Sequence, residues 1–426
     1  MAELKRVQPP VFPVERMTMP EVNSTKLSNG IEVYLIESGT EEITRIEFIF
    51  RAGQVMEHIP LLASSTNMML KEGTRNYTAE EINNKLDYFG AFLNLAIDKD
   101  MGGMVVYSLN RHQDKVLELC KEILFMPEFP EKEMNALMKK RQQWYRINRE
   151  KVQNLAYDQL FELMFGKEHP YGRQISEQDY TKLNPGLLKE FHSSFYVPEK
   201  MTIIVSGVIP SSTIGVLEEL FGSLRGHGNA GIKLNTDLKS STTKKLIIEK
   251  SSAVQTAIRI GSPSINKRHA DYHGLKVVDT LLGGYFGSRL MRNIREDKGY
   301  TYGIRSNLTS LELSGYKMIS TEVGNEYAEN TVNEIYKEIA ILHEELIKSD
   351  ELETVRNYML GEMVRMFDGP FATAESFRSA WEFGFDNSYY TRFAGKIRTI
   401  EPEEIRSLAR EYYNIDGLHE VRAGRK

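Results

Sequence analysis

An internal repeat constrains the fold of this chain more than any other feature of its sequence. Residues 184–196 align with residues 401–413. Each segment predicts a helix with a proline in its first turn and an aromatic pair at its end. The prolines, Pro185 and Pro402, lie 217 positions apart in a chain of 426 residues. The sequence therefore predicts a duplicated architecture with two similar halves.

Both halves predict an α+β fold. In the first half, Thr78 and Glu81 form a capping-box pattern that opens a helix, and Gly90 ends that helix. The other predicted elements of this half are strands 31–36, 45–50, 92–97 and 104–109 and helices 61–70 and 113–124. The second half repeats this order with strands 245–249 and 255–260, a helix over 271–282, and strands again from Tyr302. We expect a mixed, mainly antiparallel sheet in each half, with helices packed on one face.

The seam between the halves is expected in a polar, glycine-containing stretch. The predicted division is an N-terminal domain over 1–221, a linker over 222–243 and a C-terminal domain over 244–426.

Composition narrows the class of protein. With 54 basic and 59 acidic residues the net charge is -5, so we expect no nucleic-acid partner. The first residues lack the apolar core of a signal peptide, and no run of about 18 apolar residues follows. We expect a cytoplasmic protein without a membrane span, or a periplasmic one if a signal was removed. The single cysteine, Cys120, excludes an internal disulfide and predicts a buried thiol.

Three stretches resemble the insulinase-type (pitrilysin) metallopeptidase family. They are residues 51–53 with 68–74 and 77–82, the loop HPYGR at 169–173, and residues 282–284 with 288–290 and 294–302. The matches cover both halves in the order found in the family. The resemblance implies a clam-shell on dimerisation, in which similar bowls enclose unfolded peptides.

Members of that family bind zinc through an H-x-x-E-H motif on a helix, where the histidines hold the ion and the glutamate activates a water. The resemblance places these positions on Ser64, Asn67 and Met68. Serine is a poor zinc ligand, asparagine cannot accept the proton, and a thioether is too soft. The glutamate that completes the site falls near Gln143, 75 positions after Met68, and residues 134–149 contain no carboxylate. We therefore expect no zinc in this chain.

The nine histidines offer no clear replacement for the lost motif. His269 and His273 lie four residues apart at the start of a predicted helix, and we interpret them as a solvated helix terminus rather than a metal pair. His58 is expected in a surface loop before the zinc-type helix.

Arg295 and Tyr302 match a second family feature, an arginine and a tyrosine seven residues apart that hold substrate across the chamber from the zinc. A guanidinium can donate to a carbonyl or carboxylate, and a phenol can donate to a developing oxyanion. From the residues alone the alternative is structural, with Arg295 near a helix C-terminus and Tyr302 packed in a strand.

A lost zinc site beside a retained Arg-Tyr pair resembles the non-catalytic subunit of the heterodimeric enzymes of this family. The resemblance implies a substrate-binding subunit of a zinc endopeptidase that acts on unfolded peptides. A homologous partner with H-x-x-E-H would carry the zinc, and this chain alone would not be catalytic. Two alternatives stay open: a structural scaffold, like the core subunits of a respiratory cytochrome complex, and an active metallopeptidase with an unrecognised zinc site.

Overall fold

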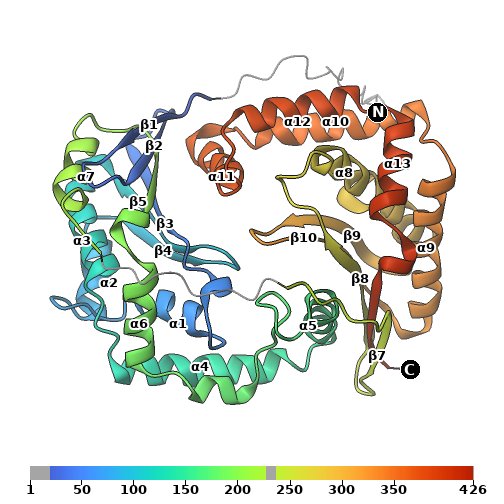
Figure 1. The fold of residues 1–426 in the computed structure, drawn as a ribbon, viewed down its shortest axis with the longest axis horizontal. Coiled ribbons are helices and arrows are strands. Elements are labelled where there is room, and N and C mark those ends of the chain that lie inside the picture. Colours follow the sequence, from blue (N-terminus) through green and yellow to red (C-terminus); the bar gives the residue numbers. More distant parts are fainter. Residues whose placement is uncertain (1–19, 227–236, 426) are drawn as a thin grey trace, which may run out of the picture.

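The chain forms two sheets with packed helices in a computed structural model that describes residues 20–226 and 237–425, which confirms the predicted α+β class (Figure 1). The N-terminal sheet has six strands in the order β1-β2-β6-β3-β5-β4. These strands are β1 (Asn23–Lys26), β2 (Glu32–Glu37), β3 (Ile43–Phe50), β4 (Phe92–Ile97), β5 (Gly102–Leu109) and β6 (Thr202–Gly207).

The C-terminal sheet has five strands in the order β7-β11-β8-β10-β9. Its strands are β7 (Lys245–Glu249), β8 (Gln255–Ser264), β9 (Thr301–Ser310), β10 (Gly315–Gly324) and β11 (His419–Gly424). The pairs β2·β6 and β7·β11 are parallel, and the other pairs are antiparallel, so both sheets are mixed and mainly antiparallel as predicted.

Helices surround the two sheets. Those of the first half are α1 (Leu62–Met69), α2 (Ala79–Tyr88), α3 (Gln113–Phe125), α4 (Glu131–Asn148), α5 (Val152–Phe165), α6 (Pro185–Phe195) and α7 (Thr213–Phe221). Those of the second half are α8 (Tyr272–Asp279), α9 (Ala328–Glu344), α10 (Ser349–Arg365), α11 (Gly369–Trp381), α12 (Ser388–Thr399) and α13 (Pro402–Tyr412). The capping box predicted for α2 is present, since the Thr78 side chain accepts from the Glu81 N–H and the Glu81 carboxylate accepts from the Thr78 N–H.

The internal repeat has a direct structural counterpart. Helices α6 and α13 begin at the repeated prolines Pro185 and Pro402. Each helix leads to a strand, β6 or β11, that enters its sheet between a parallel neighbour and an antiparallel one. The last strand of each half therefore completes a sheet whose other strands come earlier in the chain.

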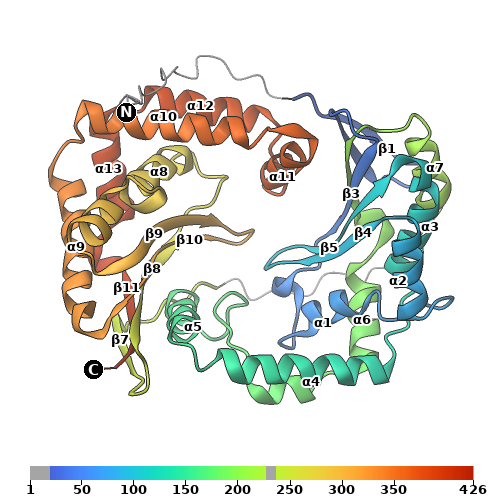
Figure 2. The ribbon, with the colours of Figure 1, turned by 180° about the vertical axis from the view of Figure 1, so that it is seen from behind.

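The halves exchange one helix each. Helix α5 of the first half packs on the C-terminal sheet, where Leu160 joins a buried apolar cluster with Ala257 and Val421. Helix α11 of the second half packs on the N-terminal sheet, where Phe377 joins Ile36 and other buried residues. Figure 1 shows α11 beside the N-terminal sheet and α5 beside the C-terminal sheet, and Figure 2 shows the same arrangement from behind. This exchange goes beyond the predicted helices on one face, because each sheet is also covered from the opposite half.

Ionic contacts reinforce the exchange of α11. Its Arg378 donates to the buried Glu47 of β3 at 2.5 Å, and Arg45 donates to the same carboxylate at 2.8 Å. A second link between the halves joins two loops, where the Asp100 carboxylate accepts from the backbone N–H of Glu312 at 2.8 Å. The halves are therefore held together by apolar burial, by the part-buried ion pair between Arg378 and Glu47, and by the hydrogen bond from the Glu312 N–H to Asp100.

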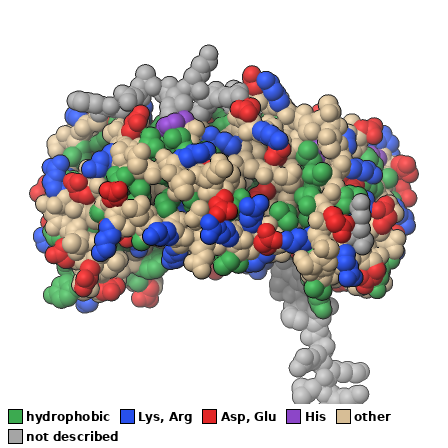
Figure 3. All heavy atoms as spheres, turned by 90° about the horizontal axis from the view of Figure 1, so that it is seen from below, with side chains coloured by type: hydrophobic (Ala, Val, Ile, Leu, Met, Phe, Trp, Pro, Cys, Tyr) green, Lys and Arg blue, Asp and Glu red, His purple; other side chains and the backbone are tan. Residues whose placement is uncertain are grey.

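The outer surface carries both signs of charge. Figure 3 shows acidic and basic side chains interspersed over the face seen from below. Within the described ranges, no helix combines the length and the apolar character needed to cross a membrane. The predicted linker 222–243 lies partly outside the described residues, between the end of α7 at Phe221 and the start of β7 at Lys245.

Candidate functional site

Helix α1 carries the three positions that the sequence analysis assigned to the lost zinc motif, and they do not share one environment. Ser64 is buried at one turn of the helix, and Met68, four residues later, is 39% exposed. Asn67 is fully buried. Residues four apart lie on the same helical face, so Ser64 and Met68 form one surface of α1 while Asn67 faces the core.

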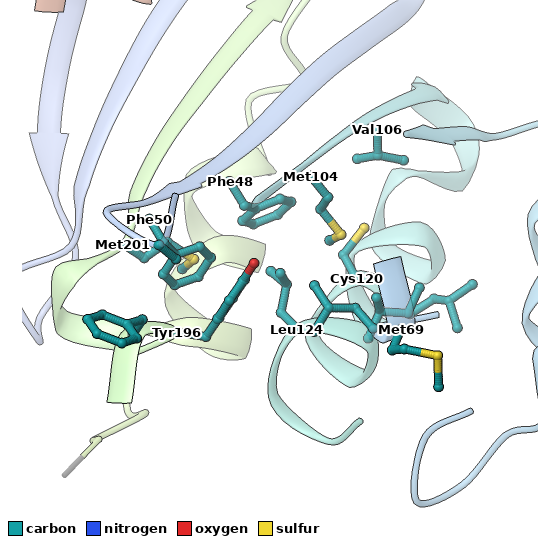
Figure 4. Packing of buried hydrophobic residues seen from close by; sticks show 14 of the residues in the cluster. Phe48, Phe50, Met69, Met104, Val106, Cys120, Leu124, Tyr196 and Met201 are labelled. Carbon is teal, nitrogen blue, oxygen red and sulfur yellow. The ribbon is translucent and has the colours of Figure 1, made fainter. Parts of the chain in front are cut away.

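Asn67 anchors α1 to the sheet. Its amide nitrogen donates to the carbonyl oxygen of Gly103 in β5 at 2.8 Å and to the hydroxyl of Tyr196 at 3.0 Å. Figure 4 shows Tyr196 beside Phe50 among the buried hydrophobic residues. An active zinc peptidase needs a glutamate at this position to activate water. This chain has the buried amide of Asn67 there, and its hydrogen bonds fix the position of α1.

Arg141 of α4 approaches the degenerate face of α1. Its guanidinium donates to the Ser65 hydroxyl at 2.7 Å and to the Ser64 hydroxyl at 2.8 Å. Burial lowers the pKa of Arg141 from its usual value, although the nearby Glu57 opposes this. The side chain that extends from α4 to α1 is therefore the cationic guanidinium of Arg141, and it is held by two neutral hydroxyl groups.

Gln143 differs from its predicted placement near the metal ligands. It lies on the exposed face of α4 and does not line the cavity beside α1. Arg141, two positions earlier, reaches Ser64 instead, because a helix turns by about 100° per residue and two positions change the face almost completely. The sequence did contain a signal for Arg141, since it lies four residues before Tyr145 and four after Leu137 on the half-buried face of α4.

Glu57, which the sequence analysis passed over, stabilises the N-terminus of α1. Its carboxylate accepts from the backbone N–H of Ala63 at 2.9 Å and of Leu61 at 3.3 Å. Arg173 lies 3.3 Å from the same carboxylate. Burial raises the pKa of Glu57 to about 7, while the Ala63 N–H and the charge of Arg173 oppose the rise.

Leu61 shows backbone strain at the same helix end. It is a buried non-glycine residue with a φ of 72°, in the left-handed region that side chains with a Cβ rarely adopt. Strain of this kind often marks functional sites. Leu61 also lines the cavity described next.

A cavity of about 650 Å³ lies beside the Ser64–Met68 face of α1. Helices α1, α4 and α5 and the loop over 171–175 enclose it, so it sits where a metal-activated water would work in a zinc peptidase. Its size is that of a small-ligand site. Six aromatic side chains line it: Trp144, Tyr145, Tyr157, Phe161, Tyr171 and Tyr180.

Arg295 and Tyr302 lie in the second half, next to strand β9. Arg295 belongs to a π-helical segment, Met291–Asp297, and its guanidinium lies 4.5 Å from the ring centre of Phe286. Tyr302 lies on β9, the edge strand of its sheet, and is 94% exposed. Neither side chain makes a hydrogen bond within the described parts of the chain. The structural alternative of a packed Tyr302 therefore does not describe its surroundings.

The exposure of two histidines agrees with the prediction from the sequence, and that of a third does not. His58 is exposed in the loop before α1, and His269 is exposed at the start of α8, as predicted. His273 is half-buried rather than solvated, because the centre of its ring lies 4.6 Å from the ring centre of Tyr389 and 5.0 Å from that of Phe393. Burial lowers the pKa of His273 to about 4, which keeps its ring neutral.

The residues at the degenerate site do not fit a catalytic zinc ion. Such an ion needs three protein ligands drawn from histidine, cysteine and carboxylate groups. Here the guanidinium of Arg141 donates to Ser64, so a positive charge occupies the approach to the helix face where a divalent cation would bind. Among the residues that the structure describes, no group of three or more His, Cys, Asp or Glu side chains could hold a metal ion elsewhere.

The fold and the site together define a duplicated α+β protein with the architecture of a two-domain metallopeptidase and without its metal-binding side chains. Comparison with known families gives the same class. A family model for the insulinase-type peptidases, Insulinase (Peptidase family M16), matches residues 38–178, and the model Peptidase M16 inactive domain matches residues 182–359. The chain belongs to the insulinase-type M16 peptidase family.

Some relatives of the chain are named as zinc proteases, and one is named as a non-peptidase homolog. A Bacillus subtilis protein named as an uncharacterized zinc protease, YmxG, is 25% identical over 340 residues, which cover 79% of this chain and 82% of that protein. A Helicobacter pylori protein named as a non-peptidase homolog, YmxG, is 22% identical over 417 residues, covering 94% and 93% of the two chains.

Solved structures match the fold over almost the whole chain. A peptidase M16 inactive domain from Pseudomonas fluorescens has a TM-score of 0.87 at 22% identity and covers 95% of this chain and 98% of its own. A protease from Helicobacter pylori has a TM-score of 0.87 at 18% identity, with 96% and 100% covered. At these identities the likeness concerns the fold.

Proposed function

We propose that this chain is a non-catalytic, peptide-binding subunit that acts beside a homologous partner with an intact H-x-x-E-H motif and its zinc ion. The contact of Arg141 with Ser64 and Ser65 carries the proposal. The guanidinium of Arg141 lies where metal-ligating side chains would be needed, and a cavity of about 650 Å³ adjoins it. A site that has lost its metal chemistry while keeping its cavity is better suited to holding a peptide than to cleaving one.

The surroundings of Arg295 and Tyr302 support a role in binding. A tyrosine that is 94% exposed contributes little to the core, so its ring and hydroxyl are available to a ligand. The π-helical turn that carries Arg295 is a rare conformation found often at functional sites. The pair would act on a peptide held at the zinc of the partner, where the phenol donates a hydrogen bond and the guanidinium orients a carbonyl.

The ends of the two sheets also favour an extended ligand. Strand β4 is the last strand of the N-terminal sheet and β9 is the last strand of the C-terminal sheet. An edge strand has unpaired backbone N–H and C=O groups along one side, and an extended peptide can bind by adding to it. Tyr302 lies on one of these edges.

The test is reconstitution with an H-x-x-E-H chain of the same family from the same genome. The chain alone is expected to hold no stoichiometric zinc after dialysis and to cleave no unfolded peptide. Mixed with the partner, it should form a complex that contains zinc and cleaves peptides faster than the partner alone. Zinc content by metal analysis, complex formation by sedimentation and peptide cleavage by chromatography give the three results.

Two outcomes would contradict the proposal in different ways. Equimolar zinc and cleavage by the chain alone would make it an active peptidase. A complex that forms but leaves the partner's cleavage rate unchanged would favour the scaffold alternative, in which this fold only supports other subunits.

A further inference from the structure

The cavity beside α1 carries an excess of positive charge. Five cationic side chains line it, against the single carboxylate of Asp158: Lys99, Lys140, Arg141, Arg149 and Arg173. Only Arg173 forms a salt bridge within the described residues, at 3.3 Å from Glu57. Glu57 and Asp100 lie near part of this lining, but the cations outnumber the nearby carboxylates. A partly buried cavity with an excess of cations attracts an anion, because the low dielectric of its walls strengthens the interaction.

Arg141 is the cation best placed to hold that anion. Two of its N–H groups donate to the Ser65 and Ser64 hydroxyls, which fix the guanidinium without neutralising it. A guanidinium has five N–H donors, so the others stay available on the cavity side. The planar fork of arginine matches the two oxygens of a carboxylate, and a fork already held in place loses little freedom on binding.

The apolar part of the cavity lining determines which chemical group can stand next to the bound anion. Six aromatic rings from α4, α5 and the segment after α5 line the wall, and Leu61, Met68 and Leu137 add aliphatic surface. Lys99 lies 5.7 Å from the ring centre of Phe161, so even part of the cationic lining packs against aromatic surface. Such a wall takes apolar or aromatic side chains and excludes a small hydrated ion.

We propose that this cavity binds a peptide carboxylate next to an apolar residue, with Arg141 in the place of the metal ion holding the carboxylate. The carboxylate is either the C-terminus of the peptide or the side chain of an aspartate or glutamate. The inference rests on the proposed peptide-binding function and names the class of peptide that the first half of the chain recognises. It assigns a role to Arg141, Ser64 and Ser65 that requires neither zinc nor a partner.

The experiment uses the full chain alone and three matched synthetic peptides. The first has a phenylalanine followed by a C-terminal residue with a free carboxylate. The second has the same sequence with an amidated C-terminus. The third is amidated and has an aspartate after the phenylalanine. Isothermal titration calorimetry gives the Kd of each.

The free-acid or the aspartate peptide, or both, should bind about 10 to 100 times more tightly than the neutral amide, the range for losing a charged hydrogen bond. The difference between the two acidic peptides shows which source of carboxylate the cavity prefers. Equal binding of all three peptides, or no binding of any, would overturn the inference.

Arg141→Gln removes the charge and keeps a polar side chain. It should lower the affinity for the preferred acidic peptide to that of the amide, and it should leave the amide unchanged. Arg141→Lys keeps the charge without the fork and should give an intermediate affinity. The matched control is Arg146→Gln on the same helix, because Arg146 pairs with Glu177 and does not line the cavity. Unchanged discrimination in Arg141→Gln would overturn the inference.

Trp144→Leu keeps the test decisive if the Arg141 variants do not fold. Trp144 lines the cavity but is 67% exposed, so its replacement should not affect folding. It should weaken the acidic and the amidated peptides by the same factor, because it removes aromatic surface and no charge. Unchanged binding of all peptides in this variant would place them outside the cavity and contradict the inference. Failure of the complex with an H-x-x-E-H partner would contradict the proposed function alone, since these measurements involve no partner.

Discussion

The two halves share one fold and differ in where they expose their polar groups. In the first half, Asn67 is buried and bonded to the core, Ser64 is covered by Arg141, and the adjoining cavity measures about 650 Å³. In the second half, Tyr302 is 94% exposed on an edge strand, and the hollow along β9 measures about 280 Å³. The first half encloses its candidate binding surface, and the second presents its candidate binding residue outward. The same sheet and helices therefore accommodate an enclosed polar site in one copy and an exposed one in the other.

The exchanged helices should give the largest effects, because each carries buried side chains into the opposite half. Phe377→Ala in α11 is expected to lower the free energy of unfolding by about 3–5 kcal/mol, and Leu160→Ala in α5 by about 2–5 kcal/mol. Denaturant unfolding measures both values. Glu375→Ala, at an exposed position of α11, is the control and should change little. Losses below about 1 kcal/mol for both variants would show that the halves are stable without the exchange.

Tyr302→Phe should lower turnover in the reconstituted complex by about 100 to 1000 times, the usual result of removing a donor to a developing oxyanion. Arg295→Ala should cost at least as much, because a displacement of the peptide by about 1 Å can cost about 100-fold. Both variants should fold and pair normally. Tyr88→Phe, at another highly exposed tyrosine, is the control. Near-full activity of both variants would leave the exposed pair without a functional role and favour a scaffold.

The pH dependence of stability should reveal the raised pKa of the buried Glu57 carboxyl group at the start of α1. Its pKa is raised by burial from 4.5 to about 7, so the stability linked to its protonation is fully present below pH 4.5 and is lost as the pH rises through about 7. The difference in unfolding free energy between the native chain and Glu57→Gln should therefore fall between pH 4.5 and pH 7 and stay constant above. Thermal unfolding at several pH values measures it. A constant difference across the range would mean that Glu57 stays ionised in the folded chain.

Rebuilding the zinc motif should have the smallest effect. Ser64→His, Asn67→Glu and Met68→His together should bind little zinc, because Arg141 stays beside the site and Asn67→Glu buries a carboxylate. Adding Arg141→Glu should improve zinc retention more than adding Gln143→Glu, since only Arg141 reaches α1. Metal analysis after dialysis compares the two quadruple variants. Better retention with Gln143→Glu would show that α4 presents a different face to α1.

Sequence patterns predicted the fold more completely than the site. The repeat of Pro185 and Pro402 predicted two similar halves, and the capping box of Thr78 and Glu81 placed α2 correctly. The replaced residues at Ser64, Asn67 and Met68 were visible as well. Arg141 was missed although its spacing from Leu137 and Tyr145 places it on the half-buried face of α4, because that spacing does not show which helix the face meets. Glu57 was missed because its partners at the start of α1 and on Arg173 are set by the fold. His273 was misjudged for a related reason, since the rings that bury it come from α12, far along the chain.

The sequence by itself determined the duplication, the α+β class, the family and the absence of zinc ligands on α1, because each can be recognised from short local patterns, which for the duplication occur twice in the chain. Only the tertiary structure decided that α5 and α11 change halves, that Arg141 rather than Gln143 faces Ser64, and that aromatic and cationic side chains meet in one cavity. The physical reason is that burial and charge compensation depend on which segments pack together. Packing joins residues such as Glu47 and Arg378, which are 331 positions apart and whose relation no local pattern contains.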